Sequence, residues 1–188
     1  MAGSINIKEI NSVWKEYPKY SSIKCFIETG TYKGGTIFHM SSFFDRLYTI
    51  ELFEKHYKNA IINANKKNIN NIKFYFGDSS IILGSLSAEI KEPSVFFLDG
   101  HFCGSNSRSV SAKNSFPLFQ ELKAINDTRS YEDMIIIDDY RLFGKKIENK
   151  DLDWTNVTKE NILNCFSDEK ILISFDRNDR FYILIKGT

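Results

Sequence analysis

The sequence predicts a single α/β domain built on a mostly parallel β-sheet, and two observations support this prediction. Short apolar runs recur along the chain with helix-length intervals between the earlier ones, as in the βαβ units of a buried parallel sheet. The last two runs are separated only by residues 176–180, which are too few for a crossover helix. We therefore expect helices on both faces of the sheet and an antiparallel hairpin at one edge.

Seven strands and four intervening helices are expected. The strands are predicted at residues 25–27, 47–50, 73–76, 95–98, 134–137, 171–175 and 181–185, and the helices at 36–44, 55–67, 79–90 and 117–125. Residues 1–22 are expected to form an N-terminal helical cap. The polar segment 102–116 follows the fourth strand and is a candidate ligand-binding loop, with an uninvolved surface loop as the alternative.

Length and composition fit one globular domain, residues 1–188, that acts on a small ligand. Hydrophobic residues make up 42% of the chain and charged residues 26%, and both fractions are ordinary. The net charge of +1 lacks the basic excess that proteins use to bind nucleic acid. The three cysteines show no C-x-x-C spacing, and no apolar run is long enough for a membrane span. We expect a cytoplasmic protein that binds neither nucleic acid nor membrane.

Glycines follow the first predicted strand, in the segment F-I-E-T-G-T-Y-K-G-G-T at residues 26–36. Glycine suits a strand-to-helix turn that needs positive φ or close approach to a ligand. The G-x-G-x-x-G spacing of dinucleotide sites is not met, because Tyr32 and Lys33 stand between Gly30 and Gly34. Glu28 disfavours a pyrophosphate and suits a cationic amino group, directly or through water. A plain structural turn is the alternative.

Two further acidic residues follow the second and third strands. Glu51 lies 21 positions after Gly30, where a carboxylate can accept hydrogen bonds from both ribose hydroxyls of an adenosine ligand. Asp78, in F-G-D-S, is placed to receive an adenine amino group, although Gly-Asp alone is a common turn. Together with Glu28, these residues predict an adenosine pocket across three strand ends.

Three aspartates follow the fourth and fifth strands, in L-D-G-H and I-I-D-D-Y. These strands are expected to be neighbours, so Asp99, Asp138 and Asp139 should converge. Converging carboxylates repel each other unless a cation neutralises them, and oxygen-rich clusters suit Mg²⁺ or another hard divalent ion. The alternative is that Asp138 or Asp139 caps the next segment and Asp99 stabilises a turn.

The motifs E-T-G-T-Y-x-G-G-T, L-D-G-H and I-I-D-D-Y resemble those of the class I S-adenosylmethionine-dependent methyltransferases. The branch they resemble most contains macrocin O-methyltransferase and other metal-dependent sugar O-methyltransferases, and the similarity extends from about residue 25 to residue 141. It implies the Rossmann-like fold of that class, five parallel strands followed by an antiparallel hairpin. It also implies methyl transfer from S-adenosylmethionine to a hydroxyl of a small molecule, a sugar or glycosylated metabolite, gripped by a divalent metal.

The motifs and the resemblance together assign the site. The metal ligands would be Asp99, Asp138 and Asp139. This branch usually has L-D-G-D where the sequence has His101, so His101 is the predicted general base, with Asp99 as the other catalytic candidate and a structural loop histidine as the alternative. Segment 102–116, with Trp14 and Tyr17, would build the acceptor pocket. Arg141 and Arg108 could pair with an anionic acceptor or could be solvated surface charges. The cofactor-binding residues would be Glu28, Gly30, Thr31, Tyr32, Gly34, Thr36, Glu51, Asp78, Ser79 and Asp99.

Two other functions stay open. A non-catalytic relative could bind S-adenosylmethionine and act as a binding or scaffold protein, although acidic residues at all five strand ends argue against degeneration. An NAD-dependent oxidoreductase would need a G-x-G-x-x-G motif and a parallel sixth strand. The identity of the acceptor and the oligomeric state are left open, with a homodimer as one option.

Overall fold

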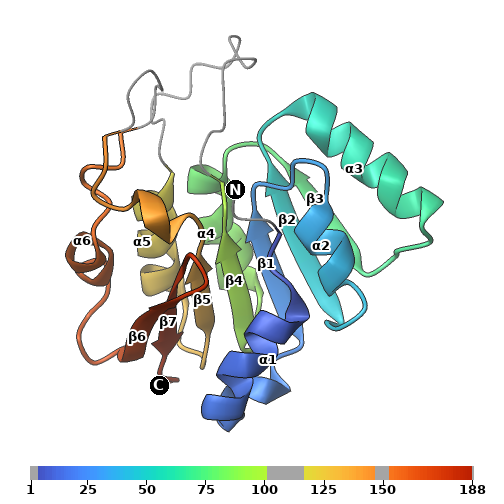
Figure 1. Cartoon of the computed structure of the whole chain (residues 1–188). Coiled ribbons are helices and arrows are strands. Elements are labelled where there is room, and N and C mark those ends of the chain that lie inside the picture. Colours follow the sequence, from blue (N-terminus) through green and yellow to red (C-terminus); the bar gives the residue numbers. More distant parts are fainter. Residues whose placement is uncertain (1–3, 101–116, 147–152, 188) are drawn as a thin grey trace.

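A seven-stranded mixed sheet forms the centre of the molecule, in a computed structural model that describes residues 4–100, 117–146 and 153–187 (Figure 1). The strand order is β3-β2-β1-β4-β5-β7-β6, with the first five strands parallel and β7 antiparallel to both neighbours. This confirms the predicted sheet and its hairpin, and each strand begins and ends within two residues of its predicted bounds. The strands are β1 (Cys25–Thr29), β2 (Arg46–Glu51), β3 (Ile72–Phe76), β4 (Ser94–Leu98), β5 (Met134–Ile137), β6 (Ile171–Arg177) and β7 (Arg180–Ile185).

Helices cover both faces of the sheet, as predicted. Figure 1 shows α1 and α2 in front of the sheet and α4 and α5 behind it. Among the described residues, no helix has the length and apolarity to cross a bilayer. The helices are α1 (Ile7–Glu16), α2 (Gly35–Met40), α3 (Glu54–Lys66), α4 (Ser79–Glu89), α5 (Leu118–Thr128) and α6 (Lys159–Leu163), with 3₁₀ helices η1 (Pro18–Ser22) and η2 (Tyr140–Leu142).

The two faces of the sheet form two hydrophobic cores. Successive residues of a strand point to opposite faces, so Phe26 and Phe97 pack with α1 and α2, whereas Ile27 and Phe96 pack with α4 and α5. All residues of β1, β4 and β5 are buried, as expected of parallel strands covered on both sides. Burial of each large apolar side chain contributes about 1.5–3 kcal/mol. The central strands therefore give a rigid base to the residues at their ends.

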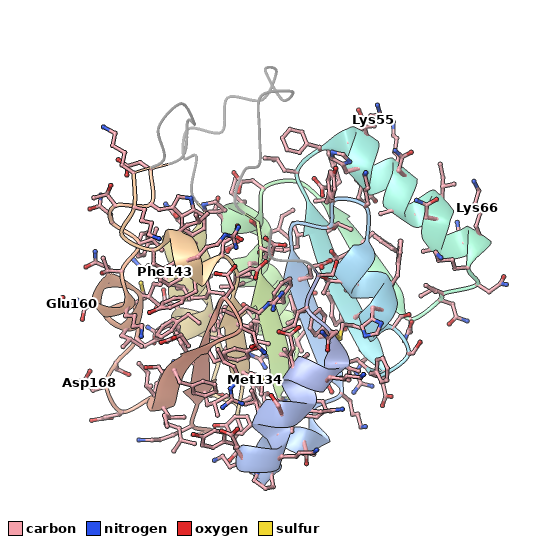
Figure 2. All side chains as sticks on the ribbon, viewed as in Figure 1. Lys55, Lys66, Met134, Phe143, Glu160 and Asp168 are labelled. Carbon is pink, nitrogen blue, oxygen red and sulfur yellow. The ribbon has the colours of Figure 1, made fainter. Side chains whose placement is uncertain are left out.

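The helix α3 differs from the others because it buries little. Only Ala60 and Ala64 are buried among its residues. Figure 2 shows Lys55 and Lys66 near its two ends, with side chains that extend into solvent. Besides these two small residues, the helix contacts the sheet through the Tyr57 ring, whose centroid lies 5.4 Å from that of Phe76 on β3.

The β6–β7 hairpin is tighter than the sequence predicts. Its strands continue to Arg177 and Arg180, so that only Asn178 and Asp179 form the turn, with φ of 52° and 64°. Two-residue hairpin loops favour positive φ at both positions, and Asn and Asp tolerate this conformation. The tight turn places Arg180 next to the end of β5.

The carboxyl ends of the parallel strands lie level at one edge of the sheet. Met134 marks the opposite end of β5 in Figure 2. Backbone hydrogen bonds continue one residue past the paired segments, with N···O distances of 2.9–3.2 Å. Their N–H donors are Gly30, Gly77, Asp99 and Asp138. The predicted site residues around these positions therefore share one edge of the molecule.

Candidate active site

Two glycines shape the loop between β1 and α2. Gly30 has a φ of 85°, and a Cβ atom there would stand 2.4 Å from the carbonyl oxygen of Asp99. Gly34 has a φ of 80° and precedes α2 at its N-terminus. Both positions need glycine because other residues rarely adopt this backbone and a side chain would collide at Gly30. Thr36, another predicted cofactor residue, is buried in the first turn of α2.

Tyr32 takes a left-handed conformation in the same loop, with a φ of 48°. Its N–H donates to Glu51 Oε2 at 2.7 Å, and the N–H of Phe53 donates to Glu51 Oε1 at 2.8 Å. A carboxylate acceptor makes both hydrogen bonds strong. The Glu51 carboxylate, buried at the end of β2, is therefore fixed on both oxygens by backbone groups from two loops.

The side chains of Tyr32 and Phe53 pack against the His56 ring on α3. The Tyr32 ring is 57% exposed, and its centroid lies 4.8 Å from that of the His56 imidazole on α3. The Phe53 ring approaches the same imidazole edge-on, with centroids 6.0 Å apart. The two residues that donate to Glu51 through their backbones thus both contact His56 through their side chains.

Glu28 lies in a buried polar network at the end of β1. Its Oε2 accepts a hydrogen bond from Thr49 Oγ1 at 2.8 Å, and Thr49 Oγ1 lies 2.6 Å from Thr31 Oγ1. Burial raises the pKa of the Glu28 carboxyl well above its ordinary value, because the charged form loses its hydration. The nearby negative charges of Asp99 and Glu51 act in the same direction. A cation beside this carboxyl would act in the opposite direction and lower its pKa.

Asp78 caps the N-terminus of α4. Its Oδ1 accepts hydrogen bonds from the Ser80 N–H at 2.9 Å and from Ser80 Oγ at 2.7 Å. The neighbouring Ser79 is buried in the first turn of the helix. Asp78 thus caps a helix, a role that the sequence analysis did not assign to it, at the strand end where the sequence places the adenine.

Asp99 follows β4 and begins the next loop. Its N–H donates to the Thr29 carbonyl at 3.2 Å, and its own carbonyl lies against Gly30. The close contact brings the ends of β1 and β4 together. The predicted base His101 and the predicted acceptor loop, residues 102–116, lie outside the described residues.

Asp138 pairs with an arginine from the neighbouring antiparallel strand. Arg180 Nε lies 3.2 Å from Asp138 Oδ1, and the two side chains are 5% and 6% exposed. Arg180 Nη1 also donates to Glu9 Oε2 at 2.6 Å and to the Asn178 carbonyl at 3.2 Å. Glu9 belongs to α1, where its other oxygen accepts the N–H of Asn6 in a capping box. This ion-pair chain links α1 to the end of β5.

Asp139 pairs with a second arginine. Arg141 Nη1 lies 2.6 Å from Asp139 Oδ1 and also contacts Asp179 Oδ2 in the hairpin turn. Asp179 holds the same segment through its other oxygen, which accepts the Arg141 N–H at 2.7 Å. The Tyr140 ring packs against those of Phe143 and Phe181 beside this network (Figure 2 labels Phe143). The segment after β5 is therefore fixed to the hairpin by charge and by packing.

Comparison with solved structures shows the fold of this chain. A protein from Staphylococcus aureus assigned as a caffeoyl-CoA O-methyltransferase matches with a TM-score of 0.63 and 13% identity, over 99% of this chain and 86% of that one. An S-adenosylmethionine-dependent methyltransferase from Clostridium acetobutylicum matches with a TM-score of 0.62 and 11% identity, over 100% and 94%. The chain has the class I methyltransferase fold.

The O-methyltransferase TomG from Streptomyces achromogenes, solved in complex with S-adenosylmethionine, also has this fold. It matches with a TM-score of 0.58 and 16% identity, over 98% of this chain and 82% of TomG. Neither the family models nor the curated proteins give a match to this sequence. The methyltransferase fold agrees with the fold predicted from the sequence motifs.

Part of the predicted cofactor set lies at the ends of β1 and β2, whereas Asp78 and Ser79 lie after β3 and Asp99 lies after β4. Glu28, Thr31 and Glu51 come close together around the turn at Gly30. The predicted metal ligands behave differently, because Asp138 and Asp139 each contact an arginine. Among the residues that the structure describes, no group of three or more His, Cys, Asp or Glu side chains is placed to hold a metal ion.

Sequence reasoning missed the role of Arg180 and left that of Arg141 open. The hairpin register could have predicted the contact between Asp138 and Arg180. Ile137 pairs with Phe181, so the following residue Asp138 lies beside Arg180, the residue that precedes Phe181. This register can be derived only when the two residues of the turn are known, and the apolar pattern alone does not identify them. Arg141 could be read either as an acceptor-binding residue or as a surface charge, and the structure pairs it with Asp139 and Asp179.

Proposed function

We propose that this chain is an S-adenosylmethionine-dependent O-methyltransferase that acts on a hydroxyl group of a small molecule. The observation that carries the proposal is the Glu51 carboxylate, held by the N–H groups of Tyr32 and Phe53 at the carboxyl end of β2. In Rossmann-like folds, a carboxylate at this place binds the ribose of an adenosine cofactor. The methyltransferase fold and the cofactor bound to TomG support the same assignment.

The donor and acceptor set at Glu51 fits a ribose. Each carboxylate oxygen already accepts one backbone hydrogen bond. A carboxylate oxygen has two lone pairs, so each can accept one more hydrogen bond from a hydroxyl. Two adjacent ribose hydroxyls would supply these two donors, with no rearrangement of the carboxylate.

The other parts of the cofactor can be assigned to residues at the ends of the strands. Glu28 would pair with the positively charged methionine amino group, because a cation beside a buried carboxylate offsets the loss of hydration that raises its pKa. Asp78 and Ser79 would meet the adenine at the end of β3. The loop from Thr31 to Gly34 and Thr36 would enclose the methionine part.

The bound cofactor would supply a methyl group on a sulfonium, which is ready for displacement at carbon. This chain then has to align the acceptor oxygen with the methyl carbon and remove the hydroxyl proton. We assign the proton to His101, with Asp99 as the other candidate. Asp99 stands two positions before His101 in the sequence, and the contact between Asp99 and Gly30 joins the ends of β4 and β1.

The divalent metal predicted from the sequence, Mg²⁺ above all, is not used in this mechanism. Its expected ligands Asp138 and Asp139 already contact guanidinium groups, so the described residues do not fit a metal site. The sugar class of the acceptor rests on the motif resemblance.

The experiment is a mass-spectrometric assay of purified protein with S-adenosylmethionine and a panel of sugars, nucleotide sugars and phenols. We expect a product that carries a methyl group in place of one hydroxyl hydrogen, together with S-adenosylhomocysteine. Methylation of phenols alone would refute the sugar assignment. Binding of the cofactor without any methylated product would favour the non-catalytic relative, and absence of binding would refute the proposed function.

A further inference from the structure

We propose that two arginine side chains, rather than a divalent cation, neutralise the carboxylates that follow β5. Arg180 pairs with Asp138 and Arg141 pairs with Asp139, at the positions where the sequence predicts metal ligands. Both ion pairs form between side chains of this chain, so the proposal can be tested without cofactor or acceptor.

The guanidinium of Arg180 is fixed between acidic side chains from two parts of the fold. Nε lies 3.2 Å from Asp138 Oδ1, and Nη1 donates to Glu9 Oε2 at 2.6 Å. The Arg180 and Asp138 side chains are almost fully buried. A dication beside Asp138 would stand next to this guanidinium, where little solvent screens their repulsion. The pair therefore opposes metal binding at Asp138.

Arg141 is held in place from two directions. Its Nη1 contacts both Asp139 and Asp179, and its backbone N–H donates to Asp179 Oδ1 at 2.7 Å. Asp179 sits in the two-residue turn whose positive φ values fix its direction. A metal bound by Asp139 would have to displace a guanidinium that the hairpin holds by side chain and backbone together.

Arg141 could also bind oxygen atoms of an acceptor, which is the role that the sequence analysis gave to the metal. Its side chain is 41% exposed, and within the described residues its ion pairs run through Nη1. Nε and Nη2 can therefore donate to oxygen atoms of a ligand, in the planar arrangement that suits two neighbouring oxygens. This second role rests on the proposed function, whereas the neutralising role does not.

The test measures the binding of Mn²⁺ to the purified protein without cofactor, by electron paramagnetic resonance. The wild type should bind Mn²⁺ weakly. Arg141→Gln removes the exposed guanidinium and should strengthen binding about fivefold, the size expected for a partly exposed ion pair. Arg177→Gln is the matched control, because Arg177 lies in the same hairpin but pairs with Glu16. It removes the same charge and should leave Mn²⁺ affinity unchanged.

Two results would overturn the inference. One is tight binding of a single Mn²⁺ by the wild type that Asp138→Asn and Asp139→Asn each abolish. The other is an equal Mn²⁺ affinity in Arg141→Gln and Arg177→Gln, both shown to be folded by circular dichroism. Neither result would bear on cofactor binding, which is measured separately with S-adenosylhomocysteine.

Discussion

The backbone N–H of Tyr32 donates to the Glu51 carboxylate at 2.7 Å, so a residue that bends the turn after β1 also holds the acidic residue at the end of β2. Tyr32 adopts positive φ where glycine is the usual residue. The hydrogen bond to a charged acceptor offsets the cost of this backbone conformation, which is about 1–2 kcal/mol. Tyr32 therefore links the loop after β1 to the end of β2.

The strain at Tyr32 leads to a prediction for stability. Tyr32→Gly and Tyr32→Ala both remove the ring, but only glycine adopts a φ of 48° without a Cβ penalty. We expect Tyr32→Gly to be the more stable variant by about 1 kcal/mol. Urea denaturation measures the difference. Equal stability, or a more stable alanine variant, would show that the turn is unstrained.

We expect Glu28 to make the stability of the protein depend on pH, because burial in the folded protein raises its pKa. A carboxyl whose pKa is raised by folding contributes its full stability below its ordinary value of 4.5, and this contribution is lost as the pH rises through the folded value. Glu28→Gln stays neutral and removes the effect. The free energy of unfolding of this variant, relative to the wild type, should therefore increase from about pH 5 upward.

The control for this measurement is Glu54→Gln, because the Glu54 side chain is 62% exposed on α3. It should follow the wild type over the same range of pH. A Glu28→Gln variant that also runs parallel to the wild type would mean that Glu28 is ionised in the folded protein without a ligand.

Arg180 should matter more to stability than the other arginine of the hairpin. Arg180→Met leaves the buried Asp138 and the nearly buried Glu9 without the guanidinium that joins them. Loss of one partner of a buried ion pair costs about 3–5 kcal/mol. Arg177→Met breaks a more exposed pair with Glu16 and should cost about 0–1 kcal/mol. Similar costs in denaturant titrations would argue against the ion-pair chain from α1 to β5.

His101 should be needed for turnover but not for cofactor binding. His101→Ala removes the proposed base and should lower kcat by about 10²-fold, with S-adenosylmethionine affinity nearly unchanged. Turnover across a range of pH with an acceptor found in the panel provides the measurement. A variant that keeps near-normal kcat from acidic to basic pH would move the proton acceptor to Asp99.

The apolar pattern was sufficient to predict the sheet, because buried parallel strands such as β4 and β5 read as short apolar runs that end abruptly in acidic residues. It was not sufficient for α6, a five-residue helix stabilised through Ile162 and its contacts with the core rather than by its own periodicity. The ion pairs of the site could not be predicted from the local sequence either. Carboxylates could be placed at strand ends from local sequence, but their arginine partners come from distant segments that only the hairpin register brings close.

The most direct test of the account is calorimetric titration of S-adenosylhomocysteine into the wild type, Glu51→Ala and Glu54→Ala. Glu54 is the matched control because it is an exposed glutamate three positions after Glu51, paired only with Lys58 among the described residues. We expect the wild type and Glu54→Ala to bind alike, and a folded Glu51→Ala to lose at least about tenfold in affinity, as two charge-assisted hydrogen bonds to the ribose disappear. No binding by the wild type, or equal affinity in all three proteins, would contradict the central claim that Glu51 anchors an adenosine cofactor.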